Sequence, residues 1–178
     1  MTLLPFPGHR PRHGGFSLPE LMIAIVIAGI LATITVGGLL VNTRVWGLRS
    51  AARELAGYLE EAQAIAAGST DLCQLRITGS GNAMQIGPHN PANNSCAAMA
   101  PARLLPSSPI PLDLSTPQIN SNIFIRPRGL IDGDQPTTIS LSASNTGGRS
   151  FCVQLVPPSA LVAIGVIQGT SCNHAAFS

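Results

Sequence analysis

Four cysteines are the residues of this chain whose types and spacing most clearly suggest chemistry. They stand at Cys73, Cys96, Cys152 and Cys172, all downstream of the one long apolar stretch. An even number of cysteines in an exported domain predicts disulfide bonds. Three pairings are possible, and we favour Cys73–Cys96 with Cys152–Cys172 because each bond closes a local loop. Closing loops of this size stabilises a fold by about 3 kcal/mol.

A metal site is the competing use of these cysteines. It would draw on His89 or His174 as further ligands. The cysteines contain no C-x-x-C pair, and neither histidine has a second histidine at the spacing typical of a zinc site. Disulfides are therefore the preferred interpretation, and we expect neither a metal nor a cofactor.

The sequence shows no constellation typical of an enzyme. It has no G-x-S-x-G nucleophile elbow and no glycine-rich loop that would cradle a phosphate. Asp132-Gly133-Asp134 would suggest calcium, but the further ligands of a calcium-binding loop are missing, and a solvated turn is the better interpretation. We expect no catalytic residues and therefore no enzymatic activity.

The stretch from Gly15 to Glu20 introduces the element that should carry the rest of the chain. It reads Gly-Phe-Ser-Leu-Pro-Glu, follows a short basic leader, and leads into residues 21–43, which bear no charge. As a helix, residues 21–43 would reach about 34 Å, enough to cross a hydrocarbon core of about 30 Å. The pattern predicts a membrane-spanning helix over residues 16–43, with Glu20 at its entrance.

This stretch resembles the signature of type IV prepilins, a glycine followed by Phe-Thr/Ser-Leu-x-Glu and an apolar helix. The resemblance implies that a prepilin peptidase cuts between Gly15 and Phe16 and methylates the new amine of Phe16. Residues 1–15 would then be a leader that the mature chain lacks. The implied partners are the prepilin peptidase, other pilin or pseudopilin subunits, and the bacterial inner membrane, with the ectodomain on the periplasmic side.

Two interpretations of Glu20 remain open. The resemblance implies that Glu20 neutralises the amine of a neighbouring subunit in the assembled filament, which would make an ionised group at lipid depth tolerable. Alternatively, the carboxylate stands at the water interface beside the first helical turn, where the helix dipole favours it. Arginines flank both sides of the apolar run, so the expected orientation rests on the motif rather than on charge counting.

The helix should extend well beyond the apolar run, from Phe16 to about Ala67. Ser17 can cap it, and Pro19 falls in the first turn, where its missing N–H does no harm. In the second half, apolar residues recur at spacings of three and four and form one stripe: Val45, Leu48, Ala52, Leu55, Leu59, Ala62 and Ala66. We expect this stripe to pack on a sheet of the same chain, with a coiled coil as the alternative, and the helix to end at Gly68.

Downstream of Gly68 the apolar period shifts towards two, which predicts antiparallel strands. A hairpin is expected around the turn at residues 79–82, and proline keeps residues 101–117 irregular. The expected strands are Leu72–Ile77, Ala83–Ile86, Asn122–Arg126, Thr137–Ala143, Ser150–Val156 and Ala160–Gln168. The predicted fold class is α+β, a long N-terminal helix packed on an antiparallel β-sheet ectodomain over residues 44–178.

Two short motifs in this ectodomain add a looser resemblance to the FimT/GspH family of minor pilins and pseudopilins. They are Phe124-x-x-Pro127-x-Gly129 and Gly148-Arg149-Ser150. The resemblance implies a pilin-like fold and a structural role in a type IV pilus or a type II secretion system. The proline-rich insertion and the four cysteines depart from a simple version of that pattern.

Charge argues against a general nucleic-acid-binding surface. The formal charge of +2 includes two leader arginines, so the eight arginines from Phe16 onward balance eight acidic residues, and there is no lysine. Since some FimT-like proteins bind DNA, an alternative function is a DNA-uptake or adhesive minor pilin. Its candidate contacts are Arg126, Arg128 and Arg149, because Arg128 and Arg149 flank two turns expected to lie together. A third interpretation, an unrelated signal-anchored exported domain, predicts no processing at Gly15.

Overall fold

The computed structural model describes residues 17–89, 94–98, 102–106, 112–131, 133–158 and 161–177, without the side chains of residues 33–37 and 98. Gly15, Phe16 and the expected leader lie outside the described residues, as does Asp132. The chain divides into two compact units, residues 1–38 and residues 39–178, and each is considered separately below.

Helix α1 runs from Leu18 to Ala67 and supplies residues to both units. It ends where the sequence predicts, because the amide of Gly68 donates to the carbonyl of Ile65 at 3.1 Å. The amide of Ser69 donates to the carbonyl of Ala66 at 3.2 Å, so bonds of the three-residue type close the last turn. The predicted stop at Gly68 is confirmed.

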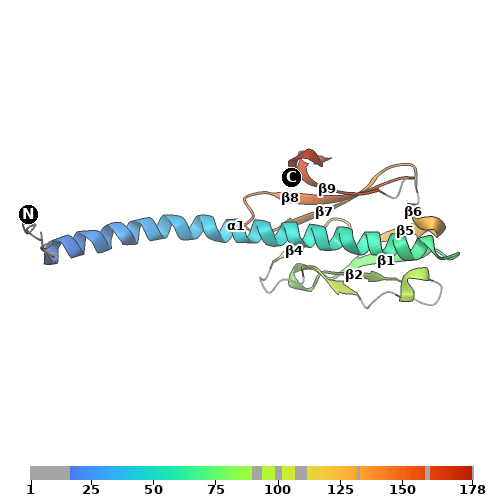
Figure 1. Cartoon of the computed structure of the whole chain (residues 1–178), viewed down its shortest axis with the longest axis horizontal. Helices are drawn as coiled ribbons and strands as arrows, with labels where there is room; N and C mark the ends of the chain where they lie inside the picture. The colour runs from blue at the N-terminus through green and yellow to red at the C-terminus, as the bar shows by residue number, and fades with distance from the viewer. Residues whose placement is uncertain are drawn as a thin grey trace, which may run out of the picture. The chain divides into compact units, whose positions relative to one another are not determined.

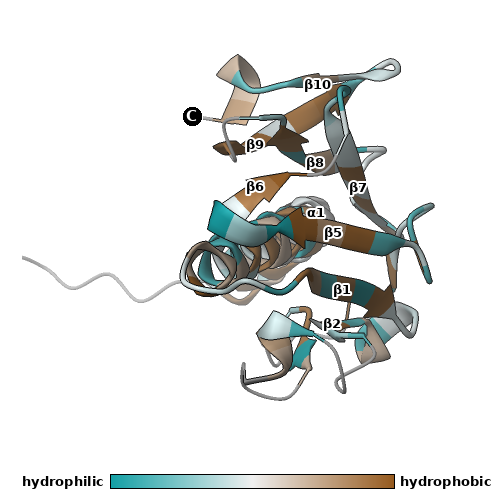
Figure 2. Cartoon of the chain, turned by 90° about the vertical axis from the view of Figure 1, so that its right-hand side faces the viewer, coloured by the Kyte–Doolittle hydropathy of each residue, from teal (hydrophilic) through white to brown (hydrophobic). Residues whose placement is uncertain are grey.

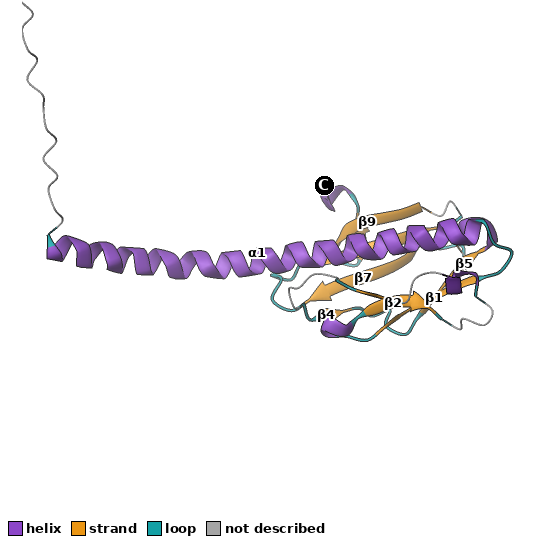
Figure 3. Cartoon of the chain, turned by 60° about the horizontal axis from the view of Figure 1, so that its bottom comes forward, coloured by secondary structure: helices purple, strands orange, loops and turns teal. Residues whose placement is uncertain are grey.

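Among its described residues, the second unit contains two five-stranded antiparallel sheets alongside the second half of α1 (Figures 1 and 3). The first sheet has the order β3-β2-β1-β5-β6 and consists of Arg103–Leu104, Gln85–Pro88, Cys73–Thr78, Asn122–Arg126 and Leu130–Ile131. The second sheet has the order β10-β9-β8-β7-β4 and consists of Ser171–Asn173, Leu161–Gln168, Ser150–Val156, Thr137–Ala143 and Leu114–Ser115.

The observed architecture confirms the predicted α+β class and refines it. The expected strands at β5, β7 and β8 have the predicted bounds. The sequence did not separate the strands into two sheets, and it missed the short strands β3, β4, β6 and β10. Strands of two or three residues are too short to show a period of two, which is why the pattern did not reveal them.

The apolar stripe of α1 forms one core with both sheets, which lie on different sides of the helix in Figure 2. Leu48, Leu55 and Leu59 are fully buried. The predicted packing of this stripe against a sheet of the same chain is confirmed by the shared core, to which Leu75 of β1 and Val153 of β8 also belong. At about 25 cal/mol per Å² of buried apolar surface, such contacts are the main source of stability.

Tyr58 is the largest fully buried side chain of α1. Its hydroxyl has no hydrogen-bond partner among the described residues, and burial raises the pKa of the phenol, so the group stays neutral in the core. The guanidinium of Arg103 lies 5.2 Å from the centre of its ring, and Arg103 also pairs with Glu61 at 3.2 Å. Tyr58 therefore joins the helix to β3 by packing and a cation–π contact.

Gly129 is where the β5–β6 turn touches α1. Its φ is +74°, and a Cβ at this position would lie 2.9 Å from the carbonyl oxygen of Gln63. We expect Gly129→Ala to lower the free energy of unfolding by about 2–4 kcal/mol, since left-handed backbone strain adds to overpacking. Chemical denaturation measures this loss.

Gly148 provides the matched control for Gly129. Its φ of +75° is nearly the same, but no described heavy atom lies within 4 Å of its Cβ position. Gly148→Ala should therefore lower the free energy of unfolding by about 1–2 kcal/mol, the contribution of backbone strain alone. Equal losses in the two variants would show that the contact between Gly129 and α1 is unimportant.

Candidate processing and assembly site

The first turn of α1 holds the carboxylate of Glu20 against Ser17. The backbone amide of Ser17 donates to Glu20 Oε2 at 2.9 Å, and the Ser17 hydroxyl donates to the same oxygen at 2.8 Å. The carbonyl of Ser17 accepts the amide of Leu21 at 3.2 Å, which makes Ser17 the N-cap. Glu20 thus fills the position from which an acidic side chain reaches back to the N-cap amide.

The helix that follows Glu20 presents apolar side chains on every side. Each large apolar residue from Leu18 to Leu31 is at least 53 % exposed: Leu18, Leu21, Met22, Ile23, Ile25, Val26, Ile27, Ile30 and Leu31. Contiguous apolar surface of this extent marks a site that another surface covers. The arrangement suits a helix that packs against other helices or lipid.

The expectations for this first unit have different outcomes. Cleavage at Gly15 and methylation of Phe16 stay predictions, because neither residue is described. Glu20 lies in the first helical turn. Its position at a water interface and its pairing with a neighbouring amine both stay predictions. None of the helices in the described part of the chain has the length and apolarity that a membrane crossing needs. The membrane span expected over residues 16–43 therefore also stays a prediction.

Comparison with known proteins identifies the N-terminal feature. Residues 10–36 match the model of the prokaryotic N-terminal methylation motif. The chain carries a prepilin-type motif. The matched range includes Gly15, Phe16 and Glu20, and it indicates a type IV pilin-like protein that a prepilin peptidase processes and that assembles with other pilin subunits. No curated protein and no solved structure matches the chain.

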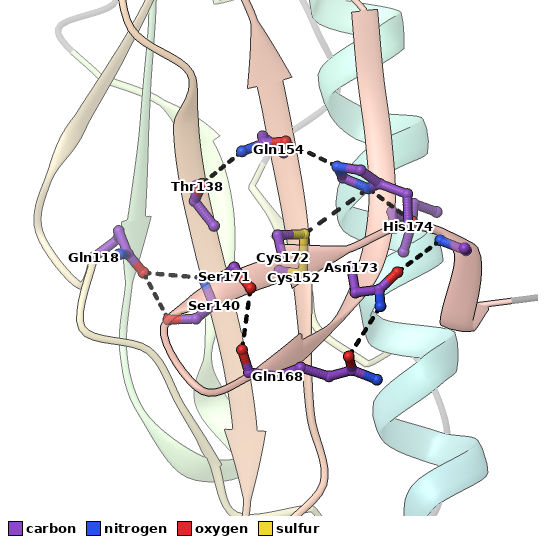
Figure 4. Close-up of a disulfide and its surroundings, with 12 residues drawn as sticks. Gln118, Thr138, Ser140, Cys152, Gln154, Gln168, Ser171, Cys172, Asn173 and His174 are labelled. Atoms are coloured by element: carbon purple, nitrogen blue, oxygen red, sulfur yellow. Dashed lines mark hydrogen bonds between the residues drawn. A yellow bond between two sulfur atoms is a disulfide. The ribbon is translucent and has the colours of Figure 1, made fainter.

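Two disulfides hold the second unit of this pilin-like chain. Cys73 bonds to Cys96 and Cys152 bonds to Cys172, the pairing favoured from the sequence, with Cα–Cα distances of 5.1 and 6.0 Å. The second bond, drawn in Figure 4, links β8 to β10 across β9. Gly165 of β9 pairs with Cys152, and a Cβ at Gly165 would lie 2.9 Å from Cys172 Sγ. Gly165 therefore leaves the space through which the bond passes.

His174 lies beside this second disulfide, with its ring Nδ1 3.9 Å from Cys172 Sγ. Its ring Nε2 is 2.8 Å from Gln154 Oε1, and its Nδ1 is 3.3 Å from the carbonyl oxygen of Ile164 (Figure 4). No group of three potential metal ligands occurs among the described residues. The hydrogen bonds of His174 fix the C-terminal segment against β8 and β9.

The structure corrects the expected arginine cluster. Arg128 lies in the β5–β6 turn beside Gly129, which contacts Gln63 of α1. Arg149 instead lines a pocket together with Asn42 of α1. Asn42 and Gln63 are about 32 Å apart at 1.5 Å per helical residue. Figure 1 accordingly shows the β5–β6 turn and the start of β8 at opposite ends of the sheets. Arg126 lies at the end of β5, so the structure does not bring Arg126 and Arg128 together with Arg149. DNA contact by any of these arginines stays a prediction.

Arg149 belongs to a cluster with Trp46, Arg49 and Phe177 that was not predicted from the sequence. The guanidinium of Arg49 lies 5.7 Å from the ring centre of Trp46 and 4.6 Å from that of Phe177. Arg53 lies 5.5 Å from the same Phe177 ring. Trp46, Arg49 and Arg53 share one helix face at spacings of three and four, a signal that the sequence does contain. The return of Phe177 to this face depends on the tertiary fold.

Proposed function

We propose that this chain is a minor pilin or pseudopilin, a structural subunit rather than an enzyme. It would serve in a type IV pilus or the filament of a type II secretion system, in line with its looser FimT/GspH resemblance. A prepilin peptidase would cut between Gly15 and Phe16 and methylate the Phe16 amine. The chain would sit in the bacterial inner membrane with a periplasmic ectodomain before it enters the filament.

One observation carries this proposal: the methylation motif coincides with the start of a helix whose apolar side chains are exposed. The match covers residues 10–36, and the exposed apolar residues from Leu18 to Leu31 lie within it. Glu20 is the only charged residue in that part of the helix. Packed helices in a filament would cover the apolar surface, and a neighbour's amine would neutralise the carboxylate.

The ectodomain supports the proposed compartment. Its two disulfides use all four cysteines of the chain. Disulfides form and persist in oxidising compartments such as the bacterial periplasm and are rare in the cytosol. An ectodomain exported to the periplasmic side accounts for both bonds.

The intact mass of the chain from a host with an active prepilin peptidase tests the proposal. We expect a mass that begins at Phe16 and includes one added methyl group. The same chain from a host without the peptidase serves as the control and should keep its leader. A chain that keeps its leader in both hosts, or that is cut after the apolar run, would instead support an unrelated signal-anchored or secreted domain.

A further inference from the structure

A pocket of about 300 Å³ opens beside the start of the ectodomain part of α1. Three aromatic side chains line it, Trp46 from the helix, Phe151 from β8 and Phe177 from the C-terminal segment. Its polar lining comes from Arg49, Arg149 and Asn42. This volume is at the lower end for small-ligand sites, and aromatic walls with a few polar groups are their usual composition.

The aromatic walls leave one large surface available for a ligand. Phe151 is buried and meets Phe177 edge to face, with 5.7 Å between the ring centres, so these two rings support each other. Trp46, in contrast, is 57 % exposed. An apolar or aromatic group bound here would cover Trp46 and gain the burial and ring contacts that the chain itself does not supply.

Two arginines give the pocket a positive charge, and none of the described residues that line it is acidic. Arg49 donates to the carbonyl oxygen of Phe177, but its Nε is buried and has no hydrogen-bond partner among the described residues. No described carboxylate forms an ion pair with Arg49 or Arg149. The Thr146 hydroxyl donates to the carbonyl oxygen of Arg149 at 3.0 Å and fixes the backbone from which that side chain extends. A bound anion would supply the missing partner for these charges.

We propose that this pocket binds a carboxylate that is attached to an apolar or aromatic group. The planar guanidinium of Arg149 would pair with the carboxylate, Arg49 would add its positive field, and the apolar group would lie on Trp46. Such a group could belong to a free organic acid or to the C-terminal residue of a peptide. A nucleic acid fits less well, because Arg128 lies at the other end of the domain, away from the pocket.

Trp46 is the only tryptophan of the chain, so its fluorescence reports directly on this pocket. The experiment titrates the processed full-length chain with 3-phenylpropionate and with its neutral amide. We expect a saturable change in Trp46 emission with the acid and at least about tenfold weaker binding of the amide, because the amide cannot form a charge-assisted bond with Arg149. A short peptide ending in phenylalanine, with a free or an amidated C-terminus, distinguishes a chain end from a free acid as the source.

Arg149→Gln should weaken binding of the acid by about tenfold or more. Arg128→Gln is the matched control, an exposed arginine in a turn remote from the pocket, and it should leave binding unchanged. The proposal is wrong if neither the acid nor the peptide changes Trp46 emission, if the amide binds as well as the acid, or if both variants lose binding equally. Equal binding of inorganic phosphate or of oligothymidine would likewise overturn it, because neither presents a carboxylate on an apolar group.

Discussion

Glu20→Ala should abolish incorporation of the subunit into filaments while cleavage after Gly15 persists. In an assembled filament the methylated amine of a neighbouring subunit would lie unpaired among apolar helices once the carboxylate is removed. Breaking a buried charge pair from one side is strongly unfavourable, and we expect at least a tenfold loss of incorporation. Immunoblots of sheared filaments measure incorporation, and the intact mass of the membrane-bound chain measures cleavage.

Two further variants separate the charge of Glu20 from its role at the helix start. Glu20→Gln keeps an oxygen that can accept from the Ser17 amide and hydroxyl, but removes the charge, and should fail to incorporate as Glu20→Ala does. Ser17→Ala removes only the hydroxyl donor and should incorporate close to normally. Glu60→Ala removes an exposed charge from the part of α1 that belongs to the second unit and serves as a control. Normal incorporation of Glu20→Gln would mean that Glu20 acts as a helix cap and not as an intersubunit partner.

The helix and the longer strands were predictable because local sequence determines them. Gly68 ends α1 where its missing side chain predicts a stop, and β7 occupies the predicted Thr137–Ala143. The division into two sheets was not predictable in this way. Whether β5 pairs with β1 or with β7 depends on contacts between distant segments, and alternation within each strand carries no information about its neighbour.

The candidate sites show the same difference between features that local sequence determines and features that depend on tertiary contacts. The disulfide pairing followed from loop closure, which depends only on spacing along the chain. The joint Arg128 and Arg149 surface required two turns to meet, and β7 instead carries the chain away from the first turn before the second one forms. The direction of β7 relative to α1 is a tertiary property, so the sequence could place each arginine in a turn but could not bring the turns together.

Removing the disulfide between Cys152 and Cys172 should both destabilise the second unit and release the C-terminal segment. The bond closes a loop with a sequence separation of 20, and its loss in Cys152→Ala/Cys172→Ala should cost about 3 kcal/mol of unfolding free energy. It also ties β10 to β8, and Phe177, which packs on Arg49 and Phe151, follows shortly after β10. We therefore expect a change in Trp46 emission in the folded state as well as the lower stability.

The disulfide between Cys73 and Cys96 offers a control of matched size. Its two cysteines have a sequence separation of 23. Cys73→Ala/Cys96→Ala should therefore lower the free energy of unfolding by nearly the same amount, about 3 kcal/mol. Both of its cysteines are buried near Ala62 of α1, away from the pocket, so Trp46 emission should stay that of the wild type. Denaturation followed by circular dichroism gives the two stabilities, and fluorescence of the folded variants gives the local effect. If both double variants changed Trp46 emission equally, general loosening of the second unit would explain the change. The second disulfide would then have no specific part in holding Phe177 at the pocket.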